Sequence, residues 1–180
     1  GSYATSIIPT LETAVTRNAD VISRTGLSNY INSSEGVLLV DLDYFTLSEA
    51  INKFITISDG TSNNYVQIRL NNNLLTYRSF VAGVGSVLLG GTFLQLNNKI
   101  AISWKNNNSQ LWLNGTKLEE DLSSSTPNNL NLLTLNNEVN AGSFFYGRLK
   151  YLQVLNTLTD AEIALLTGTL DETYYTTYLD

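Results

Sequence analysis

The side chains able to do chemistry here are carboxylates, tyrosines, lysines and arginines, because the chain contains no histidine and no cysteine. This composition removes thiol nucleophiles, Ser-His and Cys-His catalytic arrangements, disulfides and the zinc sites that need those ligands. Asp41 and Asp43 form a carboxylate pair of the kind that glycoside hydrolases use. On a strand, however, two residues at this spacing share one face, and a solvated charged face is the commoner reason for such a pair.

The two tryptophans fall in a hairpin predicted from Lys99–Lys105 and Gln110–Leu113, with its turn at 106–109. The alternation of side chains puts Trp104 on the face that carries leucines and isoleucines, which predicts a place in the core. Trp112 points to the opposite face of the hairpin.

We expect Trp112 to be the centre of a ligand site. Its neighbours on that face, Ala101 and Ser103, are too small to bury the ring. A flat ring with a polar edge suits stacking on the apolar face of a sugar. The alternative is that the first residues or the C-terminal tail of the chain cover Trp112.

Tyr65, Gln67 and Arg69 alternate along a strand predicted at Tyr65–Leu70, opposite its apolar face. Their polar groups suit sugar hydroxyls or, for Arg69, a carboxylate. The alternative is an ordinary solvated strand face. If this strand lies in the same sheet as Trp112, these residues form one shallow glycan-binding surface with an affinity of about millimolar to tens of micromolar.

Composition predicts an all-β protein. Charged residues make up only 14% and hydrophobic residues 43%, and much of the remainder is Asn, Ser and Thr, which favour turns and exposed strand faces. Apolar alternation predicts strands at Val37–Tyr44, Phe54–Ser58, Tyr65–Leu70, Leu74–Ala82, Lys99–Lys105, Gln110–Leu113, Leu130–Leu135 and Ser143–Leu155. Asn- and Gly-rich runs between them, which include Gly90-Gly91, are predicted to be turns. Short strands at this spacing indicate a two-sheet antiparallel β-sandwich.

One short helix is expected near the C-terminal end. Thr159 and Glu162 form a capping-box signature, and Ile163, Leu165 and Leu166 supply an apolar side. The net charge of −6 disfavours nucleic acid as a partner. No apolar run reaches the roughly 18 residues of a membrane helix, so we expect no membrane insertion.

Three runs carry a resemblance to a known fold. Two are typical of paired strands, Lys99-Ile-Ala-Ile-Ser-Trp-Lys and Gln110-Leu-Trp-Leu-Asn-Gly-Thr-Lys-Leu, and a third is typical of a closing strand and helix, Phe145-Tyr-Gly-Arg-Leu-Lys-Tyr-Leu-Gln-Val-Leu-Asn-Thr-Leu-Thr-Asp-Ala-Glu-Ile. Together they resemble concanavalin A-like lectin and glucanase jelly rolls, in particular laminin G-like modules, from Glu35 to Thr167.

The opening residues carry a second resemblance. The run is Gly1-Ser-Tyr-Ala-Thr-Ser-Ile-Ile-Pro-Thr-Leu-Glu-Thr-Ala-Val-Thr-Arg-Asn-Ala-Asp. It resembles a linker-plus-first-strand motif that recurs in phage tail-fibre and virion proteins and in marine bacterial surface proteins. These resemblances predict a lead-in segment and first strand at 1–34, a jelly roll at 35–168 and a tail at 169–180.

The resemblance implies non-catalytic recognition of a cell-surface or extracellular polysaccharide, for receptor binding or adhesion, on a virion or outside the cell. The alternative is a structural module that packs sister domains or a homotrimer in a fibre and binds no sugar. Retaining glucanases of this fold carry a Glu-x-Asp-x-x-Glu strand, and polysaccharide lyases of this fold carry a Gln-x-His motif. Neither motif occurs in the sequence, so we expect no enzyme.

Laminin G-like modules often bind Ca²⁺ at the rim of the sandwich. Asp59 lies in the oxygen-rich run Ser58-Asp-Gly-Thr-Ser-Asn-Asn, and oxygen ligands are what this ion requires. We therefore expect Asp59 as a metal ligand, with an ordinary hairpin turn as the alternative.

Overall fold

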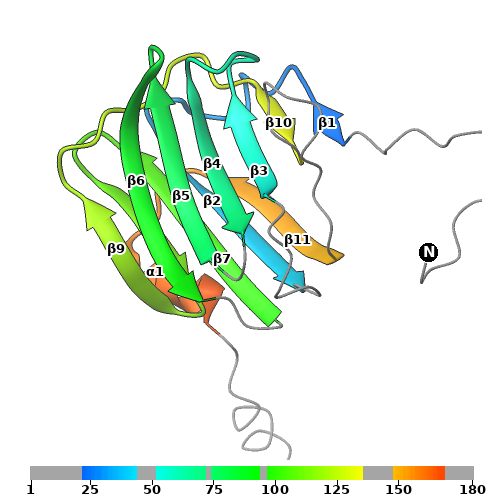
Figure 1. Ribbon diagram of the computed structural model, residues 1–180, viewed down its shortest axis with the longest axis vertical. Coiled ribbons are helices and arrows are strands. Elements are labelled where there is room, and N and C mark those ends of the chain that lie inside the picture. The colour runs from blue at the N-terminus through cyan, green and yellow to red at the C-terminus, as the bar shows by residue number, and fades with distance from the viewer. Residues whose placement is uncertain (1–21, 44–51, 72–73, 94–96, 136–147, 169–180) are drawn as a thin grey trace, which may run out of the picture.

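The computed structural model describes residues 22–43, 52–71, 74–93, 97–135 and 148–168, which form two antiparallel sheets and one helix (Figure 1). Sheet A has, in spatial order, the strands β1 (Ser23–Arg24), β10 (Leu132–Thr134), β3 (Lys53–Ser58), β4 (Tyr65–Asn71), β5 (Leu74–Val81) and β6 (Val84–Phe93). Sheet B has β11 (Arg148–Leu155), β2 (Glu35–Asp43), β7 (Asn97–Lys105), β8 (Ser109–Leu113) and β9 (Thr116–Asp121). The predicted two-sheet β-sandwich is confirmed.

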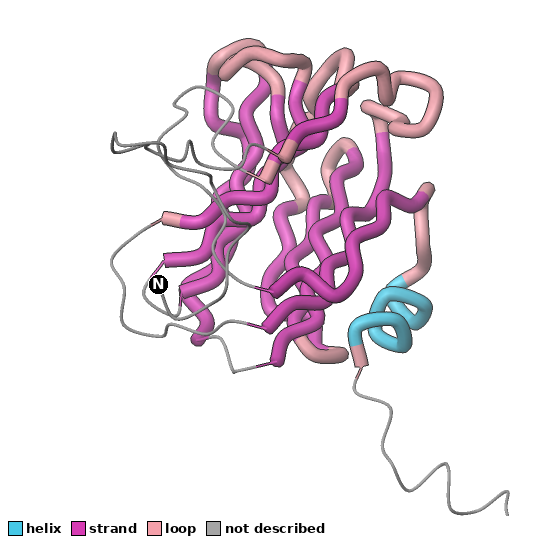
Figure 2. The backbone as a smooth tube through the Cα atoms, turned by 90° about the vertical axis from the view of Figure 1, so that its right-hand side faces the viewer, coloured by secondary structure: helices cyan, strands magenta, loops and turns pink. Residues whose placement is uncertain are grey.

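The helix, α1 (Asp160–Thr167), lies on the outer side of sheet B (Figure 2). It has eight residues, and none of the helical structure described here is long and apolar enough to cross a membrane. The elements therefore make three layers, which are sheet A, sheet B and α1.

The core lies between the sheets, where alternate residues of both point inward. Leu38 and Val40 of β2 face Val66 and Ile68 of β4 across the sandwich, and all are fully buried. This alternation buries one face of each strand, as the sequence pattern predicts. Tyr44, which the same pattern assigns to the core, lies outside the described residues.

The residues before β2 contribute to the sandwich. β1 pairs with β10, and Ile31 is 5% exposed within the core. Residues 1–21 and 169–180 lie outside the described residues, so the division at 34/35 and 168/169 stays a prediction.

Three of the described strands are not predicted by apolar alternation, namely β1, β6 and β9. The expectation of a turn at Gly90-Gly91 is wrong, because β6 runs through both residues. Gly90 has φ 136° at a bulge in β6, where Leu75 pairs with Thr92 and Thr76 pairs with Gly90. A Cβ there would lie 2.3 Å from the Leu75 carbonyl oxygen, so glycine is needed within the strand rather than at its end.

The edges of β6 and β9 close one side of the sandwich. The Gly90 N–H donates to a Glu119 carboxylate oxygen at 2.8 Å. Beyond β9, the Ser125 N–H donates to Ser86 Oγ at 2.8 Å. Side chains thus form hydrogen bonds with backbone N–H groups at this edge, which could otherwise pair with another strand.

The central hairpin keeps its predicted faces. A turn at 106–109 would pair Ser103 with Trp112, and the observed register differs from this by two residues. Ser103 pairs with Gln110 and Ala101 with Trp112, because the turn begins earlier and Asn107 adopts a positive φ of 57°. A shift of two residues leaves every side chain on its predicted face.

Trp104 lies on the core face of this hairpin, one residue before β7 ends, and is 1% exposed. Its indole N–H donates to the Asn32 carbonyl at 2.9 Å. The ring lies directly over Gly36 on β2, where a Cβ would come within 2.4 Å of Trp104 Cζ2. The ring is therefore placed by a glycine on the neighbouring strand.

Gly36→Ala is expected to lower the free energy of unfolding by about 1–3 kcal/mol, the usual cost of overpacking a core. Gly85→Ala is the matched control, because its Cβ would lie 3.8 Å from the Phe80 ring, an ordinary contact. Denaturant titration of both variants measures the difference. Wild-type stability in Gly36→Ala would contradict this packing of Trp104.

Candidate functional site

Trp112 lies on the outer face of sheet B, as predicted, but its ring is covered. It is 4% exposed. Ile163 of α1 packs with Val37, Leu39 and Ala101 around it, which makes a second apolar cluster outside the main core. The expectation of an open ring at Trp112 is therefore wrong, and a helix covers the ring.

α1 is fixed at both ends. The Thr159 hydroxyl accepts the Glu162 N–H at 3.3 Å and the Glu162 carboxylate accepts the Thr159 N–H at 2.7 Å, which confirms the predicted capping box. At the other end Lys99 Nζ donates to the Gly168 carbonyl at 3.0 Å. The helix is thereby tied to β7.

The buried side of α1 differs from the predicted one. Ile163 is 1% exposed and Thr167 is fully buried, whereas Leu165 and Leu166 are 71% and 41% exposed. Residues four apart share a helix face, so packing of Ile163 on Trp112 brings Thr167 inward and turns Leu165 to solvent.

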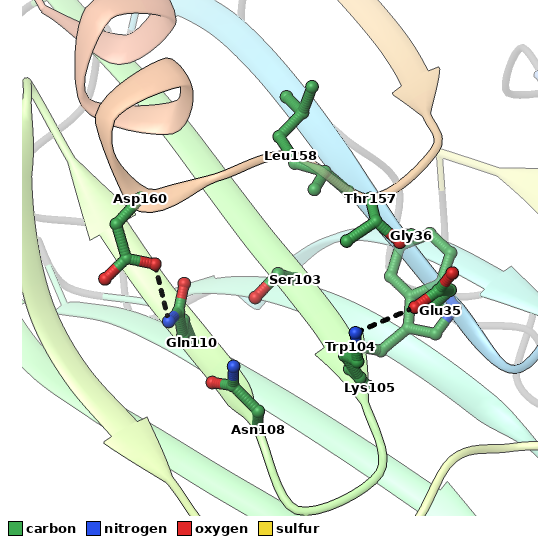
Figure 3. Close-up of a pocket in the computed structure, with 11 residues that line it drawn as sticks. Glu35, Gly36, Ser103, Trp104, Lys105, Asn108, Gln110, Thr157, Leu158 and Asp160 are labelled. Carbon is green, nitrogen blue, oxygen red and sulfur yellow. Dashed lines mark hydrogen bonds and ion pairs between the residues drawn. The ribbon is translucent and has the colours of Figure 1, made fainter.

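A small polar pocket lies beside the start of α1 (Figure 3). The Gln110 amide donates to Asp160 at 3.0 Å and its oxygen accepts the Trp112 indole N–H at 3.0 Å. Lys105 pairs with Glu35 at 3.1 Å on the opposite side. The volume is about 40 Å³, which suits water rather than a sugar ring. The hydrogen bond between Gln110 of β8 and Asp160 of α1 therefore holds the helix against sheet B.

The carboxylates of this pocket are held in their charged form. The Gln110 amide and then Lys117, at 3.0 Å, lower the pKa of Asp160. The Thr157 hydroxyl and then Lys105 lower the pKa of Glu35. A general acid requires the opposite shift, so both carboxylates act as hydrogen-bond and charge partners.

Tyr65, Gln67 and Arg69 lie together on the outer face of sheet A, opposite Val66 and Ile68. The face of these residues is as predicted. The assumption that their strand shares a sheet with Trp112 is wrong, because β4 belongs to sheet A and β8 to sheet B. The two groups therefore lie on opposite outer faces of the sandwich and do not form one site.

Two of these three side chains are buried on that face. Tyr65 is 6% exposed and Gln67 is 2% exposed, with the Gln67 amide donating to Thr56 Oγ1 at 2.9 Å. Arg69 is half-buried and donates its Nε–H to Asn52 at 2.9 Å. The expectation of a solvated, freely accessible row is wrong for Tyr65 and Gln67.

The accessible part of this face lies on β5 and β6. Phe80 stacks on Tyr65 with ring centroids 4.9 Å apart and an interplanar angle of 14°, and it also lies against Gly85 of β6. The Arg78 guanidinium carbon is 5.5 Å from the Phe80 centroid. Leu88, the partner of Arg78 across the ladder, is 72% exposed.

These side chains surround a depression of about 240 Å³, which we call the Phe80 hollow and which is lined by Arg78, Phe80, Gly85, Ser86, Val87 and Leu88. Pockets for drug-sized ligands begin at roughly 300 Å³, so the hollow suits one ring of a larger ligand. It combines an aromatic ring, a guanidinium and an exposed aliphatic chain.

A sequence signal for the hollow exists. Arg78 and Phe80 alternate with the buried Tyr77 in a strand that the pattern predicts. Leu88 is on β6, which the sequence pattern does not predict as a strand because its glycines are typical of turns. When β6 is not predicted, the sequence does not show which side chains lie beside the outward-facing residues of β5.

Asp59 is engaged within its own turn. Its carboxylate accepts the Thr61 N–H at 2.8 Å, the Thr61 hydroxyl at 2.7 Å and the Asn64 amide at 2.8 Å. Across the described ranges, no group of three or more acidic side chains converges as a metal site would require. These contacts are those of a turn, the alternative to calcium binding.

Asp43 lies with basic side chains rather than in a catalytic pair. Its carboxylate contacts Lys150 at 2.5 Å and Arg148 at 4.0 Å, both on the neighbouring strand β11. These are cross-strand ion pairs that tie β2 to the edge of sheet B.

No protein-family model matches the sequence, and no curated protein matches it. Among solved structures, the fold is similar to the CBM40 module of Ruminococcus gnavus IT-sialidase bound to α2,3-sialyllactose, with a TM-score of 0.61 and 15% identity over 84% of this chain and 97% of that chain. The chain shares the β-sandwich fold of this module.

Two larger proteins contain similar domains. A leech intramolecular trans-sialidase complexed with 2,7-anhydro-Neu5Ac has a TM-score of 0.60 and 14% identity over 84% of this chain and 28% of that chain. A botulinum neurotoxin type C structure, described by its dependence on two ganglioside molecules for cell entry, has a TM-score of 0.57 and 12% identity over 78% of this chain and 36% of that chain. At these identities the likeness concerns the fold.

Trp112→Ala is expected to lower the free energy of unfolding by about 3–5 kcal/mol, the range for buried large-to-small changes, and thus by as much as Trp104→Ala. The reason is the loss of the cluster beneath α1. Denaturant titration of both variants gives the comparison. A cost below about 1 kcal/mol for Trp112→Ala alone would mean that α1 does not cover the ring.

Proposed function

We propose that this chain recognises a glycan through the Phe80 hollow, without catalysing a reaction. The observation that carries the proposal is the juxtaposition of Phe80, Arg78 and Leu88 on one outer face. An aromatic ring with a neighbouring guanidinium offers a sugar both a stacking surface and planar hydrogen-bond donors. The alternative surface at Trp112 is covered by α1.

The similar structures support this class of function. The CBM40 module is a carbohydrate-binding domain solved with a bound sialylated sugar, and the neurotoxin is described with ganglioside ligands. Both kinds of ligand are glycans met outside the cell. We accordingly place this module on a virion or at a cell surface, in line with the resemblance of residues 1–20 to tail-fibre and surface-protein linkers.

The finer family is part of the proposal. The hairpin and closing strand resemble a concanavalin A-like, laminin G-like jelly roll, and we propose this relationship for the domain. A calcium ion at Asp59 is not needed by the Phe80 hollow, which uses an aromatic ring and a guanidinium.

A hollow of this size is expected to bind weakly, at about millimolar to tens of micromolar per module. Useful adhesion then requires several copies, since linked sites gain avidity of roughly a hundredfold or more through effective concentration. A fibre of identical chains would provide such copies.

A second candidate function is packing within a fibre. Leu165 and Leu166 of α1 are exposed and form a small apolar surface on the outside of sheet B. A structural module would use such a surface to contact a sister chain.

Leu88→Ser is expected to weaken glycan binding about fivefold, because losing roughly 1 kcal/mol of apolar contact changes an affinity by that factor. Leu165→Ser is the matched control, since the two leucines are 72% and 71% exposed on opposite faces. A glycan array identifies the ligand, and titration of both variants gives the ratio.

Sedimentation of the same variants tests the second function. Glycan binding that is about fivefold weaker in Leu88→Ser and unchanged in Leu165→Ser supports recognition at the Phe80 hollow. The result that would contradict recognition has two parts. No glycan on the array binds, and the wild-type protein forms an oligomer that dissociates in Leu165→Ser. That outcome would replace the proposal with a packing role.

A further inference from the structure

Charge is divided unevenly between the two sheets. The strands of sheet A contain no aspartate or glutamate, and their charged residues are Arg24, Lys53, Arg69 and Arg78. The strands of sheet B carry charges of both signs, with the acidic residues Glu35, Asp41, Asp43, Glu119, Glu120 and Asp121 and the basic residues Lys99, Lys105, Lys117, Arg148 and Lys150. In a chain with a net charge of −6, the strands that form the Phe80 hollow are thus free of acidic residues.

Glu119 of sheet B reaches β6 itself, where its carboxylate accepts the Gly90 N–H at 2.8 Å, whereas Glu35, Asp41 and Asp43 lie on β2, across the sandwich. Packed sheets lie roughly 10 Å apart, and charges are screened beyond a Debye length of about 8 Å at physiological ionic strength. Asp59, between β3 and β4, already accepts hydrogen bonds from Thr61 and Asn64. Among the residues that line the hollow, Arg78 is the charged one.

Arg78 is the side chain best placed to meet an anion. Within the described ranges no side chain forms a hydrogen bond or an ion pair with it, and its contact is with the face of Phe80. Arg69, by contrast, is engaged by Asn52. The planar guanidinium has N–H groups that can donate in parallel to the two oxygens of a carboxylate, and a cation–π contact with a ring does not use them.

We infer that the Phe80 hollow selects acidic glycans, with a sugar ring against Phe80 and Leu88 and its carboxylate paired with Arg78. This inference rests on the proposed function and adds the chemical class of the ligand. It is compatible with the acidic composition of the chain, since the strands of sheet A, which form the hollow, carry no aspartate or glutamate.

The test compares matched acidic and neutral probes. One pair is 3′-sialyllactose and lactose, and the other is trigalacturonic acid and its methyl ester. Isothermal titration or NMR titration gives the four affinities. In at least one pair the acidic member is expected to bind about tenfold more tightly, and the preference is expected to shrink in 1 M NaCl, where the Debye length falls to about 3 Å.

Arg78→Gln is expected to reduce that preference to less than about twofold while weak binding of the neutral probe persists. Arg148→Gln is the matched control, because it removes the same charge from β11 of sheet B, where the side chain is 70% exposed. It is expected to keep the preference. Thermal melts check that both variants are folded.

The outcomes separate the two proposals. Equal affinity within both pairs, or a preference that survives Arg78→Gln, overturns the selection of acidic glycans and leaves glycan recognition standing. No binding of any probe, together with an empty glycan array, overturns glycan recognition and this inference with it.

Discussion

The packing of Ile163 on Trp112 determines which outer face of the sandwich is available to a ligand. Trp112 has the side-chain type that a sugar site needs, but with α1 in place it is 4% exposed. The capping box at Thr159 and the contacts of Gln110 with Asp160 and Trp112 hold the helix there. Trp112 of sheet B thereby has a structural role, and the Phe80 hollow lies on the outer face of sheet A.

Glycine has opposite uses on the two sheets. At Gly36 the missing side chain admits the Trp104 ring into the core. At Gly85 it leaves room on the outside, where the Phe80 ring lies against the neighbouring strand. Cross-strand aromatic–glycine pairs of this kind position a ring without enclosing it. A glycine on the neighbouring strand therefore admits one ring into the core and leaves the other lining the Phe80 hollow.

Much of the fold is predictable from the sequence because side chains alternate with a period of two. That periodicity assigns Trp104 and Trp112 to opposite faces even though the hairpin register shifts by two residues. It also identifies the inward face of β2. Strand order is different, because nothing local to β4 or β8 says which sheet either one joins. The Phe80 hollow is not predictable either, because β6, with its bulge at Gly90, does not show the alternation of a regular strand.

The central claim is that a glycan binds at the Phe80 hollow and not at Trp112. The most direct measurement is an NMR titration with 3′-sialyllactose that follows signals on both faces. The account predicts shifts at the Leu88 methyl groups, the Phe80 ring and Arg78 Nε–H, while the Trp112 indole N–H, which is bonded to Gln110, stays in place. Shifts at the Trp112 indole with none at Leu88 or Phe80 would contradict it.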